Sequence, residues 1–172
     1  MNFMKPWLAA SIVCVAFHAQ AADRSPAHLA TKKAVHTATA APAATAAAIL
    51  EANKKIAVAF YEAAINRKDY ASAVPLLGPQ YRQHNPTAQD GAAGLQAFIE
   101  FLKSRYPNQH GDIRRVIAEG DLVVLHVYSS RGDNTPGRAI VDIFRLDKGK
   151  VVEHWDVIQD IPGQSANTNG MF

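Results

Sequence analysis

Residues 139–158 read AIVDIFRLDKGKVVEHWDVI, in which two runs rich in Val and Ile flank a short polar segment. Lys148-Gly149 lies at the centre of that segment and is typical of a two-residue β-hairpin turn, because glycine readily adopts the positive φ that such turns require. Two further runs of similar composition precede this hairpin and are bounded by glycine-containing turns. Together the runs predict an antiparallel meander with strands at 113–118, 122–129, 139–146 and 151–158.

Apolar residues recur at helical spacing in three segments before the meander, which predicts helices over 49–66, 72–77 and 90–106. The third helix is the clearest, because Asp90 can act as its N-cap and Pro107 ends it. Helices followed by a meander predict an α+β domain, which we place at residues 49–172.

The first 21 residues have the pattern of a secretory signal peptide. Lys5 precedes an apolar run, and Ala19-Gln20-Ala21 matches a small-x-small cleavage site. The run is shorter than the ~20 residues that a membrane-spanning helix needs, so we expect cleavage near Ala21 rather than an uncleaved anchor. The only cysteine, Cys14, lies within the run, and the mature chain would have neither disulfides nor a thiol nucleophile. These features predict a periplasmic or secreted protein.

Residues 22–48 are rich in Ala, Thr and Pro and contain no aromatic residue, which predicts a flexible spacer. The net charge is +3 and the basic residues are scattered, so nucleic acid is not an expected partner. No other segment is apolar enough to span a membrane, and no membrane partner is expected after cleavage. Both faces of the middle strands are apolar, whereas the predicted helices can cover only one face of the sheet. We therefore predict a homodimer through the face that carries Val141, Ile143, His154 and Asp156.

The two hairpins allow side chains to be paired across the strands. If the longer loop is centred on Asn134, His126 lies directly opposite Asp142, with Cβ atoms ~4.5–5.5 Å apart. A two-residue turn at Lys148-Gly149 places Trp155 on the other side of Asp142, whereas a three-residue turn would place His154 there. We prefer the two-residue turn because it puts Val151, Trp155 and Val157 together on the more apolar face.

This pairing predicts one sheet face that surrounds Asp142 with apolar and aromatic groups, namely Val124, His126, Tyr128, Phe144 and Trp155. Loss of solvation would raise the pKa of the Asp142 carboxyl and suit it to proton transfer. A neighbouring His126 imidazole could share that proton. The alternative is a purely structural Asp–His pair that joins two strands.

Four segments together resemble the SnoaL-like proteins, relatives of polyketide cyclases within the nuclear-transport-factor-2-like superfamily. They are Tyr81–Pro86, Val141–Arg145, Val152–Pro162 and Asn169–Phe172. The resemblance implies a cone-shaped fold, in which a curved antiparallel sheet wraps around a long helix and its open end forms a pocket.

The resemblance also implies site residues. Asp142 and His126 are similar to the acid/base aspartate and nearby histidine of the cyclases. Tyr81, His84 and Asn85 would lie near the cavity. The strand pairing described above adds Tyr128, Phe144 and Trp155 as a binding surface for a small apolar ligand. The histidines show no metal-ligand spacing, so we expect neither a metal nor another cofactor.

Two functions follow. The first is a cofactor-free enzyme that removes a proton next to a carbonyl, with His126 or Tyr81 stabilising the enolate, as aldol cyclisation, isomerisation and dehydration all require. The second is a binding or dimeric interaction module without turnover, because this fold supports many functions.

Overall fold

The computed structural model describes residues 44–172. The predicted signal peptide, Cys14 and most of the predicted spacer lie outside the described residues. Helix α1 (Ala46–Tyr61) begins three residues before the expected start at Ile49, because the side chain of Thr45 caps it by accepting a hydrogen bond from Ala48 N–H at 3.2 Å. A π-helical turn (Glu62–Asn66) continues the helix to the predicted end.

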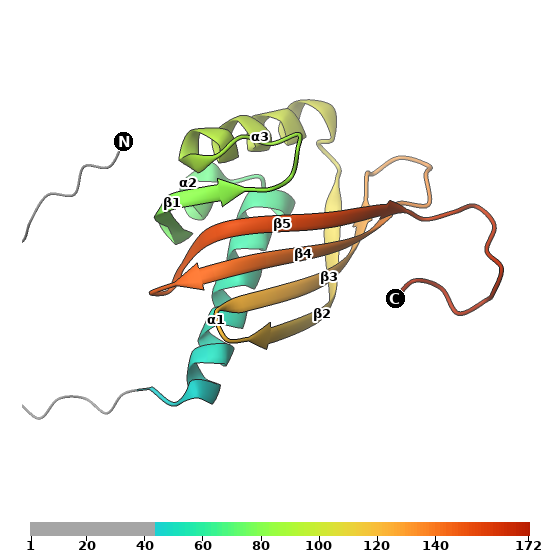
Figure 1. The fold of residues 1–172 in the computed structure, drawn as a ribbon. Helices are drawn as coiled ribbons and strands as arrows, with labels where there is room; N and C mark the ends of the chain where they lie inside the picture. The colour runs from blue at the N-terminus through green and yellow to red at the C-terminus, as the bar shows by residue number, and fades with distance from the viewer. Residues whose placement is uncertain (1–43) are drawn as a thin grey trace, which may run out of the picture. The chain divides into compact units, whose positions relative to one another are not determined.

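The α+β class is confirmed (Figure 1). Helix α2 (Tyr70–Ala73) and a 3₁₀ turn (Val74–Leu76) lead into strand β1 (Leu77–Gln83), which the sequence analysis did not predict. Helix α3 (Gly91–Arg105) follows, and Asp90 occupies its N-cap position. The Asp90 side chain does not cap the helix; it accepts a hydrogen bond from the backbone N–H of Gln83 at 2.7 Å.

The remaining strands form the predicted meander: β2 (His110–Glu119), β3 (Leu122–Ser130), β4 (Arg138–Asp147) and β5 (Lys150–Asp160). The sheet order is β1-β5-β4-β3-β2, and β1 pairs with β5 in parallel, so the sheet is antiparallel except at that edge. Within residues 44–172, the sheet curves around α1, with α3 beyond one edge (Figure 1). None of the described helices is long and apolar enough to cross a membrane.

The core lies between α1 and the concave face of the sheet, which we call the inner face. Val123, Leu125 and Val127 of β3 are fully buried there, together with Phe60 of α1 and Phe144 of β4. Phe60 and Phe144 pack edge to face with their ring centroids 5.7 Å apart, which is a favourable aromatic geometry.

The predicted pairing of β3 with β4 is wrong by one residue. Asp142 lies opposite Leu125, and His126 lies opposite Val141. The loop is centred between Asp133 and Asn134 rather than on Asn134, because Arg138 already pairs with Ser129. Since side chains alternate along a strand, this shift turns His126 and Tyr128 to the outer face and leaves the aliphatic residues of β3 inside.

The predicted pairing of β4 with β5 is correct only beside the turn. Leu146 lies opposite Val151 as expected, but a bulge at Val152 shifts the register beyond it. Asp142 therefore lies opposite Asp156 rather than Trp155. Without the bulge, Glu153 would point into the core beside Phe144. With it, Glu153 faces outward and pairs with Arg145 at 2.9 Å.

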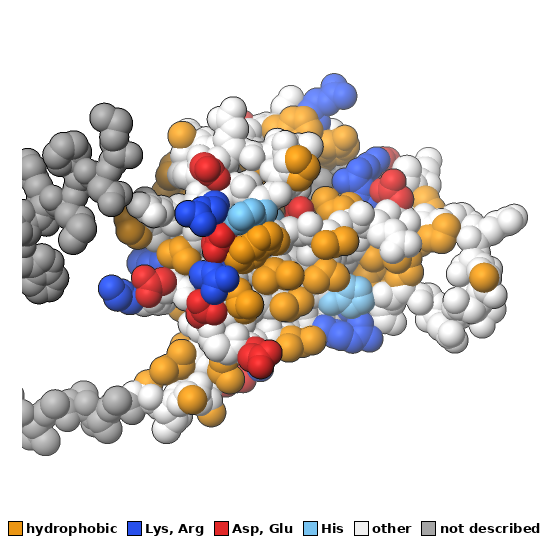
Figure 2. Space-filling model, in the orientation of Figure 1, with side chains coloured by type: hydrophobic (Ala, Val, Ile, Leu, Met, Phe, Trp, Pro, Cys, Tyr) orange, Lys and Arg blue, Asp and Glu red, His pale blue; other side chains and the backbone are white. Residues whose placement is uncertain are grey.

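The bulge reverses the predicted faces of β5. His154 and Asp156, expected on the dimer face, point to the inner face, and Trp155 points outward. Apolar side chains gather across the outer face of the strands (Figure 2). Phe172 packs on this face, with its ring 5.2 Å from that of His126 and 5.5 Å from that of Tyr128.

Candidate active site

A pocket of about 560 Å³ lies between the inner face of the sheet and the helices. That volume is in the range that accommodates small organic ligands. Its middle is apolar and is lined by Phe60, Tyr61, Ala64, Ile65, Leu95, Phe98, Phe101, Leu102, Ile140 and Phe144. Polar groups occur at two places, around Asp142 and around Arg138, which lie on the same face of β4.

Asp142 is the most unusual polar residue of the pocket. It lies in the middle of β4 and is only 6% exposed. Its Oδ1 is 3.0 Å from His154 Nε2, whereas its Oδ2 is buried and has no hydrogen-bond partner among the described residues. Burial raises the pKa of the Asp142 carboxyl above its ordinary value, and the hydrogen bond to His154 opposes that rise in part.

The tautomer of His154 follows from its second partner. Gln83 Oε1 accepts a hydrogen bond from the backbone N–H of Asn85 at 2.9 Å, which fixes the orientation of the Gln83 amide. The same oxygen lies 2.9 Å from His154 Nδ1, so Nδ1 carries a hydrogen and donates it. Nε2 then faces Asp142 with one proton between the two side chains, and Asp142 and His154 form a pair that shares this proton.

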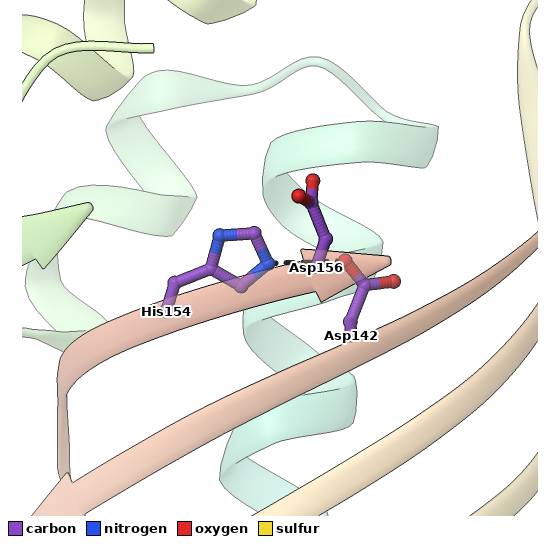
Figure 3. Close-up of side chains that lie close together, drawn as sticks. All are labelled: Asp142, His154 and Asp156. Atoms are coloured by element: carbon purple, nitrogen blue, oxygen red, sulfur yellow. Dashed lines mark hydrogen bonds and ion pairs between the residues drawn. The ribbon is translucent and has the colours of Figure 1, made fainter. Parts of the chain in front are cut away.

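Asp156 lies beside this pair on β5 (Figure 3). Its Oδ2 accepts a hydrogen bond from Asn85 Nδ2 at 2.6 Å, while Asn85 Oδ1 accepts from the backbone and the hydroxyl of Thr87. The segment from Gln83 to Thr87 therefore holds both His154 and Asp156 in place. The negative charge of Asp156 also contributes to raising the pKa of the Asp142 carboxyl.

Two tyrosines line the pocket close to Asp142. Burial, followed by the charge of Asp142, raises the pKa of both Tyr61 and Tyr81. The Tyr81 hydroxyl oxygen accepts a hydrogen bond from Gln83 Nε2 at 3.2 Å. Its own hydrogen is therefore available to donate to a ligand in the pocket.

Asp142, His154 and Asp156 are also the described residues best placed to bind a divalent metal ion. One ligand atom from each lies within 4.8 Å of the others. Two carboxylates and an imidazole suit several first-row transition metals, and the hydrogen bond from His154 Nδ1 to Gln83 would orient Nε2 toward such an ion. The proton between Asp142 and His154 would have to leave first.

The predicted site residues divide between the two faces of the sheet. Asp142, Tyr81, Asn85 and Phe144 line the pocket. His126, Tyr128, His84 and Trp155 do not line it. The His84 ring instead stacks on Trp155 at 4.7 Å, and His84 Nε2 lies 2.8 Å from Glu153 Oε1.

The sequence analysis missed His154, Asp156 and Gln83. One signal was available in β3, where Val123, Leu125 and Val127 are a more uniformly apolar alternating set than Val124, His126 and Tyr128. Placing that set inside gives the correct pairing of Asp142 with Leu125. The bulge at Val152 has no comparable signature in composition.

The comparisons with known proteins agree with this fold. A family model described as a SnoaL-like domain matches residues 57–154, more than half of the chain. The chain belongs to the SnoaL-like family. This SnoaL-like chain matches none of the curated proteins.

Several solved structures are similar to this SnoaL-like protein. TsrD from Streptomyces laurentii is 24% identical with a TM-score of 0.52, over 63% of this chain and 88% of its own. A putative polyketide cyclase from Bacillus cereus is 20% identical with a TM-score of 0.55, over 62% and 74%. IdmH from Streptomyces antibioticus, also a putative polyketide cyclase, is 20% identical with a TM-score of 0.51, over 62% and 91%. At these identities the similarity shows a nuclear-transport-factor-2-like fold.

Proposed function

We propose that this SnoaL-like protein is a cofactor-free acid/base catalyst that acts on a small, mostly apolar carbonyl compound. The observation that carries the proposal is the buried Asp142 carboxyl, whose Oδ2 has no partner in the described chain while Oδ1 shares a proton with His154. A carboxyl oxygen that loses solvation without a compensating hydrogen bond destabilises the fold, and costs of this kind are typical of functional sites.

The proposed step is proton removal from the carbon next to the carbonyl. The shared proton moves fully to His154 Nε2, which leaves the negative charge on Asp142. Asp142 Oδ2 then takes the substrate proton, the C–H electron pair forms the enolate double bond, and the carbonyl π electrons move to its oxygen. The Tyr81 hydroxyl donates a hydrogen bond to that oxygen, and the apolar wall excludes water.

This step can be tested before the natural substrate is known. Aldol closure, isomerisation and dehydration share enolate formation, and in D₂O an enolate that is reprotonated by a base in exchange with solvent acquires deuterium at the α-position. Wild-type protein in D₂O is expected to accelerate α-deuteration of aryl and alkyl methyl ketones, followed by NMR. Addition of a chelator is expected to leave the rate unchanged. A ketone that binds the pocket without accelerated exchange would instead indicate a binding module.

We further propose that the outer face of the sheet pairs with a second copy of the chain. Val141 and Ile143 lie on this face as predicted, while His154 and Asp156 do not. Val157, on the same face, is 67% exposed, and an apolar surface of this kind is seldom left in contact with water.

Val157→Asp is expected to convert a dimer into a monomer, because it places a charge within the proposed apolar interface. Sedimentation at micromolar concentration measures the change. Ile49→Asp on α1 is a matched control, since Ile49 is 47% exposed on a different surface, and it should leave the dimer intact. A monomeric wild-type protein would refute the proposal.

Export remains a proposal based on residues 1–21. Protein recovered from the periplasm is expected to begin near Ala22, and its intact mass would be reduced by the mass of the signal peptide. Recovery of the full-length mass from the cytosol alone would contradict this expectation.

A further inference from the structure

The second polar region of the pocket has no role in the proposed proton transfer. Arg138 begins the inner-face row of β4 and lies opposite Asp160 of β5, with Nε 3.0 Å from Oδ1. Asp142 is four residues farther along the same face. At ~3.3 Å per residue, the two Cα atoms are about 13 Å apart, with Ile140 between them.

Arg131 adds a second guanidinium to this region. It lines the pocket and lies over the Tyr106 ring, 5.7 Å from its centroid. It forms no ion pair with any residue in the described part of the chain. The nearby Asp133 carboxylate instead accepts hydrogen bonds from Thr135, and it is exposed.

Ser129 places a buried hydroxyl beside the two arginines. It is the direct partner of Arg138 across β3 and β4, is 2% exposed and lines the pocket. It is also the only polar member of the inner-face row that contains Val123, Leu125 and Val127. Its hydroxyl makes no hydrogen bond within residues 44–172, so it is available to a ligand.

The net charge of this region is positive. Lys68 is buried nearby and its Nζ donates to the Gln109 carbonyl at 2.8 Å, with Gln109 itself on the pocket wall. The three positive charges of Lys68, Arg131 and Arg138 are opposed by two exposed carboxylates, Asp133 near Arg131 and Asp160, whose side chain is 79% exposed. The opposite region, with Asp142 and Asp156, is acidic. The pocket is therefore polarised along its length.

We propose that the pocket takes an anionic carbonyl compound, such as a keto acid, whose carboxylate binds Arg131, Arg138 and Ser129 while its carbonyl lies at Asp142. Arginine is suited to this role because its guanidinium binds carboxylates through two parallel hydrogen bonds. This inference rests on the proposed function for the position of the carbonyl. The arginine subsite by itself rests only on the groups described above.

The test uses a homologous series of methyl-ketone carboxylates of increasing chain length, each compared with its methyl ester. Binding is measured by titration calorimetry and α-deuteration by NMR. The carboxylate of optimal length is expected to bind about tenfold more tightly than its ester, the usual value of a charge-assisted hydrogen bond. Arg131→Gln and Arg138→Gln should each remove this preference, whereas Arg138→Lys should keep part of it.

Arg114→Gln is the matched control, because Arg114 packs against Tyr128 and Phe172 on the outer face and should not affect either ligand. Melting temperatures identify any variant that fails to fold. Equal affinity for acid and ester, unchanged in the arginine variants, would overturn the arginine subsite. Proton exchange measured with the same ligands would still support the proposed catalysis. Arginine-dependent binding without exchange would support the subsite and overturn the proposed catalysis. Absence of binding by the whole series would overturn both.

Discussion

Asp142→Asn is expected to lower the rate of α-proton exchange by ~10²–10⁴, the usual contribution of a general acid or base. Asparagine has the shape of aspartate and can donate a hydrogen bond to His154 Nε2, so the local geometry should persist. It cannot accept a proton from carbon. The loss would therefore appear in the exchange rate rather than in ligand affinity.

The same substitution is expected to raise stability at neutral pH. Burial raises the folded-state pKa of Asp142 above its ordinary value of 3.8, so the folded protein binds more protons than the unfolded chain just above that pH. Wild-type stability therefore falls as pH rises from 3.8 through the raised folded-state pKa. The asparagine variant has no such loss. The substitution should therefore raise the free energy of unfolding by ~0.5–2 kcal/mol at pH values above the raised pKa of Asp142, and by little below pH 3.8.

Thermal melts from pH 3 to pH 8 would measure this difference. Asp147→Asn is the matched control, because Asp147 is exposed at the end of the same strand and should show no comparable gain. A marked destabilisation of Asp142→Asn at pH 7 would indicate that the carboxylate holds β4 and β5 together. The site would then be structural, and the binding alternative would be favoured.

The structure shows why sequence periodicity predicted the elements more accurately than the site. Helical spacing and alternating Val and Ile depend on local geometry, and they placed α3 and the meander within a few residues of their observed bounds. The site depends on register, where an error of one residue exchanges the faces of a strand. His126 was therefore placed on the inner face and His154 on the outer face, the reverse of what the structure has. Asp142, Tyr81 and Asn85, which the family resemblance indicated, line the pocket.

The bulge at Val152 explains the part of that error that concerns His154 and Asp156. The bulge is one extra residue in β5, and it is stabilised by contacts with other parts of the fold. It moves Glu153 outward to His84 and Arg145 and brings His154 inward to Asp142. None of these partners is adjacent in sequence. The hydrogen bond with His84 and the one from Arg145 hold the pKa of the Glu153 carboxyl below its ordinary value, which is consistent with an outward, ionised side chain.

His154→Gln is expected to reduce exchange by ~10²–10³, because glutamine can hydrogen-bond to Asp142 but cannot take up the shared proton. His126→Gln is the matched control: His126 lies on the outer face near Phe172, and its replacement should leave the rate unchanged. The pair of variants therefore distinguishes the observed register from the predicted one. A large loss in His126→Gln with none in His154→Gln would contradict the structure.

The double variant tests whether Asp142 and His154 act as one unit. If they share a single proton, removing either abolishes the same step, and Asp142→Asn with His154→Gln should be no slower than Asp142→Asn alone to within a few-fold. Independent roles would instead make the two losses multiply, to ~10⁴ or more, because the separate free-energy terms would add. Multiplicative losses would show that His154 acts on the substrate directly, and they would rule out a shared proton as the basis of catalysis.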